Sequence, residues 1–161
     1  MKSILFFLFN CLLIGCNAEA MHPQNDCLDK AYDILKGESL IVGKDVWGFD
    51  GVVKSTEQGW AFTVIVKNSK SPCDLFVKLA KSGSYYGLIG LHKLDPALYR
   101  ASLAEFSGNS TVCLVTGDSF EDVDGAYFLS QYIEKRGSQI FDSMLNDKLP
   151  HWSTTVRVRR P

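Results

Sequence analysis

The residues that come closest to a catalytic arrangement are Asp118 and Ser119, which follow the short apolar run Thr111–Thr116. A serine hydroxyl attacks a carbonyl only when a nearby base takes its proton and hydrogen-bond donors stabilise the oxyanion that forms. The candidate base in the C-terminal part of the chain is His151, which Asp147 precedes. A hydrolase would need the fold to bring these side chains together.

The segment Gly117–Phe120 resembles the block that carries the nucleophilic serine of GDS-type esterases. In that family the block lies near the start of the mature chain, and an Asp-x-x-His pair follows late in the domain. Here the segment lies late in the chain, and Asp147 and His151 are one residue too far apart for the pattern. We therefore expect no catalytic residue and no enzyme, and we interpret Ser119 as part of a turn. A GDS-type esterase is the least favoured alternative.

Carboxylates gather before Gly125 in a way that could indicate calcium: Asp118, Glu121, Asp122 and Asp124. An EF-hand loop has glycine at its sixth position. If Gly125 were that glycine, Phe120 would be the first ligand and Gln131 the bidentate twelfth, and neither side chain fits. The spacing of the histidines does not suit zinc: His22, His92 and His151. We therefore predict neither a metal ion nor a cofactor.

The N-terminus has the pattern of a signal peptide. Lys2 precedes the apolar run Ile4–Ile14, which is too short to span a bilayer because a transmembrane helix needs about 20 apolar residues. The run leads into Leu-Ile-Gly-Cys16, which resembles the lipobox of bacterial lipoproteins. That resemblance implies lipidation of Cys16 and stable anchoring in a membrane. In lipoproteins of enteric bacteria, an aspartate after the lipidated cysteine tends to retain the protein in the inner membrane. Here Asn17 follows the cysteine, so the resemblance implies an outer-membrane lipoprotein that faces the periplasm.

An alternative is cleavage after Ala20, at the end of an Ala-x-Ala sequence, which would release a soluble secreted protein. Both interpretations place the mature domain outside the cytoplasm, where disulfides form. The disulfide candidates are then Cys27, Cys73 and Cys113. They allow one disulfide and one unpaired thiol, and the sequence leaves all three pairings open.

The composition is that of a single globular domain, with 161 residues of which 46% are apolar and 22% are charged. The formal net charge of −1 argues against a nucleic-acid-binding protein, because phosphate binding depends on an excess of lysine and arginine. We expect a signal peptide over residues 1–15 and a lipidated cysteine with its tether over 16–25. The folded domain then covers 26–135, and a C-terminal extension covers 136–161.

Short apolar runs bounded by Gly, Asn, Ser or Pro predict three consecutive strands: Phe49–Val53, Trp60–Lys67 and Leu75–Leu79. Ser84–Leu91 either continues the third strand or forms an extra one. Apolar residues at helical spacing predict a helix over Asp26–Gly37, and an Asp-Pro start predicts a second helix over Asp95–Phe106. Further strands are predicted over Thr111–Thr116 and Ala126–Ile133.

The order of three strands, a helix and two strands is that of the OB fold, a five-stranded barrel with a helix between strands three and four. We therefore expect a mainly β chain of the α+β class, with this barrel and a short N-terminal helix. The C-terminal extension is predicted as a helix over Gly137–Leu149 and a basic strand over Trp152–Pro161. In outline, Val46–Lys135 resembles the barrel of small bacterial envelope lipoproteins.

Strict alternation along the predicted strands leaves one half-polar sheet face as a candidate binding surface. Its residues are Thr63, Lys67, Phe76 and Lys78, with Tyr85 and Tyr86 nearby. The chain is thus predicted to be a non-catalytic, lipid-anchored protein that binds another envelope component, either a protein or a glycan. The alternative is an immunity or inhibitor protein directed against a periplasmic toxin or lytic enzyme. We do not expect nucleic acid as a partner.

Overall fold

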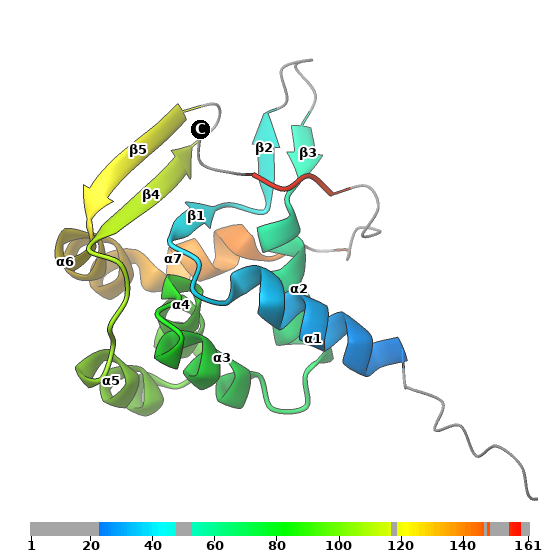
Figure 1. Cartoon of the computed structure of the whole chain (residues 1–161), viewed down its shortest axis with the longest axis horizontal. Coiled ribbons are helices and arrows are strands. Elements are labelled where there is room, and N and C mark those ends of the chain that lie inside the picture. The colour runs from blue at the N-terminus through cyan, green and yellow to red at the C-terminus, as the bar shows by residue number, and fades with distance from the viewer. Residues whose placement is uncertain (1–22, 48–52, 117–118, 147, 149–154, 159–161) are drawn as a thin grey trace, which may run out of the picture.

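Helices predominate in the computed structural model, which describes residues 23–47, 53–116, 119–146, 148 and 155–158 (Figure 1). The helices are α1 (Pro23–Leu35), α2 (Glu57–Asn68), α3 (Pro72–Lys81), α4 (Tyr85–Leu94), α5 (Pro96–Ala104), α6 (Gly125–Tyr127), the π-helix η1 (Phe128–Ile133) and α7 (Glu134–Met144). The strands are β1 (Leu40–Val42), β2 (Asp45–Trp47), β3 (Val53–Ser55), β4 (Thr111–Thr116) and β5 (Ser119–Asp124).

The strands form two small sheets. In the first, β1 pairs in parallel with β4 and β4 pairs antiparallel with β5, so that β4 is the central strand. In the second, β2 and β3 form an antiparallel pair. Within the described residues the three-stranded sheet is open, and no five-stranded barrel is present. The predicted OB fold, and with it the mainly β class, is wrong.

The helix α2 occupies the segment Trp60–Lys67, for which alternation predicted a strand. The first two-thirds of α2 are buried, from Gln58 to Ile65, and a helix with apolar residues on every side cannot be distinguished from a buried strand by periodicity. Its N-terminus is fixed by Thr56, whose Oγ1 accepts a hydrogen bond from the N–H of Gly59 at 2.9 Å. The strand prediction failed because α2 has no polar face that would reveal its period.

The helices α3 and α4 replace the predicted strand Leu75–Leu79 and the predicted strand segment Ser84–Leu91. Pro72 begins α3, and three residues at helical spacing face the core: Phe76, Leu79 and Ala80. The two helices approach each other closely, because a Cβ atom on Gly87 would lie 2.3 Å from the backbone nitrogen of Ala80. The absence of a side chain at Gly87 therefore permits this helix contact.

Three predicted elements are confirmed. The helix α1 covers most of Asp26–Gly37, and β4 coincides with Thr111–Thr116. The helix α5 begins after Asp95, whose carboxylate accepts hydrogen bonds from two backbone N–H groups of the first turn, both at 3.0 Å. In contrast, the predicted strand Ala126–Ile133 is wrong, because α6 and η1 are helical there.

The C-terminal extension differs in detail from the prediction. The helix α7 begins and ends earlier than the predicted helix Gly137–Leu149. Of the predicted basic strand, residues 155–158 are described, and Val156 forms an isolated parallel bridge with Thr56. The predicted strand Phe49–Val53 lies outside the described residues, except for its last residue, which begins β3.

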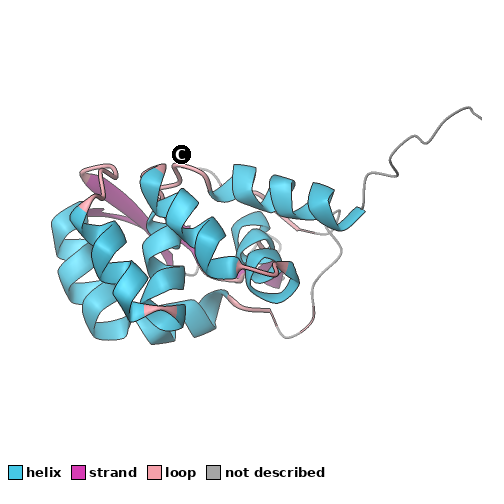
Figure 2. Cartoon of the chain, turned by 90° about the horizontal axis from the view of Figure 1, so that it is seen from below, coloured by secondary structure: helices cyan, strands magenta, loops and turns pink. Residues whose placement is uncertain are grey.

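The main core lies between the helices and the inner face of the three-stranded sheet. Phe62 of α2 occupies its centre, and the centroid of its ring lies 5.2 Å from those of both Phe76 and Phe141. From the sheet, β4 contributes Val112 and Leu114. Figure 2 shows the helices grouped in front and the strands behind them, so that the sheet lies against one side of the helical layer.

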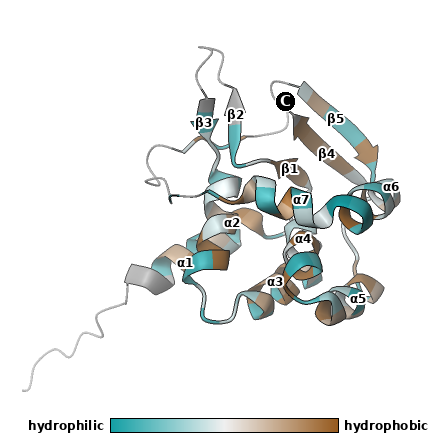
Figure 3. Cartoon of the chain, turned by 180° about the vertical axis from the view of Figure 1, so that it is seen from behind, coloured by the Kyte–Doolittle hydropathy of each residue, from teal (hydrophilic) through white to brown (hydrophobic). Residues whose placement is uncertain are grey.

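A smaller apolar cluster lies on the other face of the sheet and consists of Leu40, Val42 and Cys113. Val158 packs against it, so the C-terminal arm, residues 155–158, covers part of this face. The arm is held by hydrogen bonds from Glu57 N to Val156 O at 2.9 Å and from Gln58 Nε2 to Val158 O at 3.0 Å. Figure 3 shows the hydrophobic character of β4 and the largely hydrophilic character of the neighbouring β5.

Candidate functional site

The structure separates the six residues of the predicted binding face. Four of them are buried: Thr63, Phe76, Tyr85 and Tyr86. The other two, Lys67 and Lys78, are exposed on α2 and α3. Because these segments are helices, residues two apart along the chain do not share a face. The six residues therefore form no common surface.

The buried hydroxyl groups connect elements of the fold. Thr63 Oγ1 accepts a hydrogen bond from the N–H of Asn146 at 3.1 Å. Tyr86 Oη donates to the carbonyl oxygen of Leu40 and accepts from the N–H of Val42, both at 3.0 Å. Burial raises the pKa of Tyr86 well above its usual range. Both residues therefore stabilise the fold. Thr63 joins α2 to the segment after α7, and Tyr86 joins α4 to β1.

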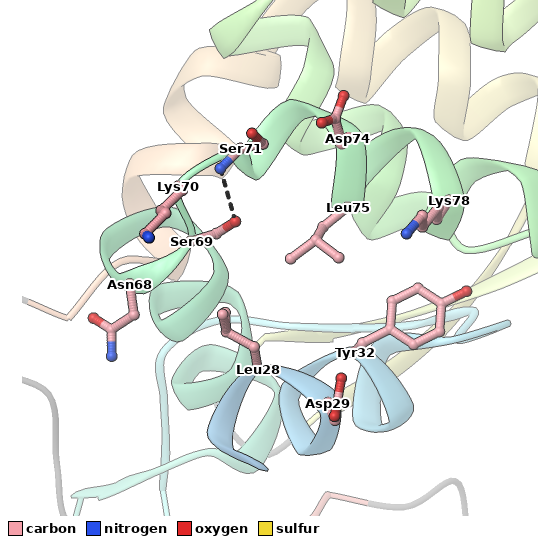
Figure 4. A pocket seen from close by; sticks show the side chains of 10 residues that line it. All are labelled: Leu28, Asp29, Tyr32, Asn68, Ser69, Lys70, Ser71, Asp74, Leu75 and Lys78. Atoms are coloured by element: carbon pink, nitrogen blue, oxygen red, sulfur yellow. Dashed lines mark hydrogen bonds between the residues drawn. The ribbon is translucent and has the colours of Figure 1, made fainter. Parts of the chain in front are cut away.

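An open groove of about 890 Å³ lies between α1 and α3 (Figure 4). Its third wall is the connection between α2 and α3. The lining residues are Leu28, Asp29, Tyr32, Asn68, Ser69, Lys70, Ser71, Asp74, Leu75 and Lys78. Ligand pockets in proteins typically have volumes of roughly 300–1,000 Å³, so the groove could hold a small molecule or a few side chains of another protein.

The base of the groove is apolar. Leu28 and Tyr32 follow one another by one helical turn on α1, and Leu75 of α3 faces them across the groove (Figure 4). All three side chains are half-buried and pack against the edge of the main core. They leave apolar surface in contact with water, and covering that surface would be favourable.

Charged side chains surround the apolar base. Asp29 lies on α1, Lys70 lies in the connection between α2 and α3, and Asp74 and Lys78 lie on α3. All four residues are exposed. Two carboxylates and two ammonium groups give the rim little net charge. This arrangement suits a segment with charges of both signs better than it suits a phosphate or a metal ion.

Local structure explains why the groove forms. Ser69 follows α2, and its Oγ accepts a hydrogen bond from the N–H of Ser71 at 3.1 Å (Figure 4). Pro72 then begins α3, in the position where a helix tolerates proline best. The helix α1 packs along α2, whereas α3 packs along α4. Because their main partners differ, α1 and α3 remain partly separated, and the groove lies between them.

The three disulfide candidates lie in three different elements, and no disulfide joins them. Cys27 is exposed on α1, Cys73 is half-buried in the first turn of α3, and Cys113 is buried in β4. Burial raises the pKa of Cys73, and the carboxylates of Asp95 and Asp74 raise it further. The Cys73 sulfur therefore stays protonated and weakly nucleophilic near neutral pH.

The described residues that were considered for catalysis or metal binding are Ser119, His92, Glu121, Asp122 and Asp124, of which all but His92 lie in β5. Ser119 begins β5, and His92 lies near the end of α4. Within the described part of the chain, no group of three or more His, Cys, Asp or Glu side chains is placed to hold a metal ion. Outside the described residues lie Cys16, His22, Asp118, Asp147 and His151.

Of the predicted binding residues, Lys78 alone lines the groove. Leu28 and Tyr32 were recognisable in the sequence as an apolar stripe on a helix, but such a stripe predicts core rather than a groove. The helical spacing of Leu75 and Lys78 in α3 was a usable signal too. This spacing is not apparent when the segment is interpreted as a strand, because the period of a strand is two residues.

Comparison of the chain with known proteins gives no significant match, whether to a family model, to a curated protein or to a solved structure. Among the described helices, none combines the length and the apolar character needed to cross a membrane.

Proposed function

We propose that the protein is a lipid-anchored binding protein of the cell envelope, which holds a segment of another envelope protein in the α1–α3 groove. The observation that carries the proposal is the groove itself, an apolar base open to solvent and surrounded by charges of both signs. The signal-like N-terminus and the lipobox-like sequence that ends at Cys16 support the location.

An amphipathic segment of a protein is the occupant that the groove favours. Apolar side chains of that segment would cover Leu28, Tyr32 and Leu75, at a gain of about 25 cal/mol for each Å² of apolar surface removed from water. Its charged side chains would meet the four charges of the rim. Helices that bind in grooves use this combination of apolar anchors and flanking charges. A glycan is less favoured, because Tyr32 is the one aromatic side chain among the lining residues.

The position of the groove fits an anchored protein. Leu28 and Tyr32 belong to α1, the first described element, which begins at Pro23. This element begins seven residues after Cys16 and overlaps the end of the expected tether. A partner bound against α1 would therefore be held near the membrane surface by a short connection.

The groove is tested with a pair of matched variants, Leu75→Asp and Leu94→Asp. Leu94 lies at the end of α4, is 39% exposed and does not line the groove. Each variant thus places the same charge at a leucine, which is half-buried in the groove at position 75 and exposed at position 94. With a photo-crosslinking residue at position 78, we expect the parent chain and Leu94→Asp to trap one envelope protein and Leu75→Asp to lose it. Circular dichroism and thermal unfolding check that both variants fold.

Equal trapping by Leu75→Asp would contradict the assignment of the groove. A product that resists protease but is removed by a glycan-degrading enzyme would identify a glycan instead of a protein. Mass spectrometry of the mature N-terminus tests the location separately, and we expect a chain that begins with lipidated Cys16. An unmodified chain that begins at Met21 would contradict the anchor without affecting the groove.

A further inference from the structure

We propose a second binding surface at the outer edge of β5, where an extended, lysine- or arginine-rich segment of a partner protein adds as a further strand. The surface consists of β5 and the start of α6, and it lies on the side of the molecule away from α1 (Figure 1). It is independent of the function proposed for the groove, since the two surfaces share no residue.

The outer edge of β5 offers peptide groups for pairing. The strand order is β1-β4-β5, so no described strand pairs with this edge. The N–H of Cys113 donates to the carbonyl oxygen of Ser39, just before β1. The peptide groups of successive strand residues point to opposite sides, so those of the next residue, Leu114, point toward β5. Leu114 lies opposite Glu121 in the antiparallel register. Phe120, one residue earlier, consequently directs its N–H and C=O away from the sheet.

The charges of β5 determine which strand can add to it. Five of its six residues are exposed, among them Glu121, Asp122 and Asp124. Like charges oppose each other when two identical edges meet, so this edge repels a second copy of itself. Neighbouring residues of a strand point to opposite faces, so Glu121 lies on one face of β5 and Asp124 on the other. Basic side chains at alternate positions of an added segment therefore meet a carboxylate on whichever face they take. Main-chain hydrogen bonds would supply affinity and the charges would supply selectivity, as in other cases of strand addition.

Exposed aromatic side chains lie at both ends of the strand. Phe120 is 43% exposed near the start of β5, and Tyr127 is 53% exposed in α6, directly after the strand. Exposed aromatic rings are enriched at protein interfaces, because they bury a large area at a small loss of side-chain entropy. An extended segment along β5 would thus find apolar contacts at each end of the row of carboxylates.

The structure holds the second of these rings in place. Asp124 ends β5, and its Oδ1 accepts a hydrogen bond from the N–H of Tyr127 at 3.0 Å. The next six residues form η1, a π-helix, and π-helical turns are rare and frequent at functional sites. The ring centroid of Tyr132 in η1 lies 6.2 Å from that of Tyr127 and 5.4 Å from that of Phe128. The corner between β5 and α6 is therefore a defined surface.

The test uses the full chain and a fluorescent peptide of eight residues with alternating valine and lysine, measured by fluorescence anisotropy. A peptide of alternating valine and glutamate reverses the charge. A third peptide keeps the valine and lysine residues but has methyl groups on its backbone nitrogens, so that it cannot donate hydrogen bonds to a sheet edge. We expect the first peptide to bind and the other two to bind at least about tenfold more weakly, because strand addition requires both charge and main-chain donors.

Charge variants locate the site. The double variant Glu121→Gln, Asp124→Asn removes one carboxylate charge from each face of β5, and asparagine keeps an oxygen that can cap α6. The matched control Asp33→Asn, Glu105→Gln removes two exposed carboxylates from α1 and from the residue after α5. We expect roughly fivefold weaker binding of the valine-lysine peptide to the β5 variant, because each exposed charge pair contributes only modestly to affinity. The control should bind as the parent chain does.

Four results would overturn the proposal. The first is equal binding of the methylated peptide, which would show attraction by charge alone. The second is equal weakening of the β5 variant and its control, which would show that the site is elsewhere. The third is an absence of binding by the valine-lysine peptide. In NMR spectra of the complex, we expect the amide signals of Phe120 and Tyr127 to shift, and shifts confined to Leu28 and Leu75 would also overturn the proposal.

Discussion

At the scale of single residues, Tyr86 shows how one buried hydroxyl joins the helical layer to the sheet. In Tyr86→Phe the hydroxyl is lost, and the buried N–H of Val42 loses the oxygen to which it donates. We expect the free energy of unfolding to fall by about 1–3 kcal/mol, the usual effect of leaving a buried donor unsatisfied. Urea denaturation measures the change. Tyr127→Phe, at a side chain that is 53% exposed, is the control and should leave the midpoint unchanged.

A second residue, Tyr99, makes stability depend on pH in the alkaline range. Burial, assisted by the charge of Glu134, raises the pKa of Tyr99 to about 12 from an ordinary value near 10. Between these values the unfolded chain has lost more protons than the folded chain. The contribution of Tyr99 to the free energy of unfolding is therefore fully present below about pH 10 and falls as the pH rises toward 12. We expect Tyr99→Phe to reduce this fall.

The measurement for Tyr99 is the urea midpoint at a series of pH values from 8 to about 11.5. The substitution removes no hydrogen bond within the described residues, because Tyr99 Oη is buried and has no partner among them. Tyr127→Phe again serves as the control. Parallel curves for the parent chain and Tyr99→Phe would show that the hydroxyl ionises as easily in the folded state as in the unfolded state.

At the scale of elements, the contact between α3 and α4 depends on Gly87. A Cβ atom there would lie 2.3 Å from the nitrogen of Ala80 and 2.6 Å from the carbonyl oxygen of Phe76, both backbone atoms. Backbone cannot move aside as a side chain can, so Gly87→Ala should destabilise the fold by about 1–3 kcal/mol or more. Gly43→Ala is the matched control, since its nearest neighbours would be 3.9 Å away. Thermal unfolding should separate the two variants by several degrees, and equal melting temperatures would contradict the close contact.

The same elements show what sequence can predict. Asp95 and the proline after it predict α5 correctly, because a helix cap and a first-turn proline act through neighbouring backbone atoms alone. The segment of α2 has the cap residue Thr56 but no first-turn proline, and α4 has no side-chain cap. The burial of both helices by other helices also removes the polar face that would reveal a period near 3.6. Short, aromatic and β-branched runs of this kind therefore look like strands.

At the scale of the whole molecule, the candidate sites could not be predicted, because each depends on segments that only the fold brings together. The groove joins Leu28 of α1 to Leu75 of α3, and nothing in the sequence near either residue specifies the other. The β5 edge was not predicted as a strand, and Ser119 was assigned to a turn, because pairing with β4 makes Phe120 and Glu121 strand residues only in three dimensions. The lipobox-like sequence differs, since a signal of that kind is confined to consecutive residues.

The C-terminal arm provides a final prediction for the whole molecule, because it joins the end of the chain to the sheet. Val158 packs on the cluster that contains Cys113, and the Cys113 side chain is 3% exposed. A charge in Val158→Asp should be expelled from this apolar cluster and should detach the arm, since a buried carboxylate without a partner is strongly unfavourable. We expect the alkylation rate of Cys113 to rise by roughly tenfold or more, in a chain whose other cysteines are serine, because local opening governs access to a buried thiol.

Arg157→Gln distinguishes loss of the arm from loss of charge on the arm. The Nε atom of Arg157 lies 3.7 Å from a carboxylate oxygen of Glu57, and the arginine side chain is 45% exposed. The Glu57 side chain is 16% exposed, but the arginine end of the pair is open to water, so the pair contributes about 1 kcal/mol or less. This variant should therefore leave the Cys113 rate close to that of the parent chain. Iodoacetamide labelling followed by mass spectrometry measures both rates. If Val158→Asp and Arg157→Gln react equally slowly, the arm does not protect the outer face of the sheet, and contacts within the sheet itself must keep Cys113 buried.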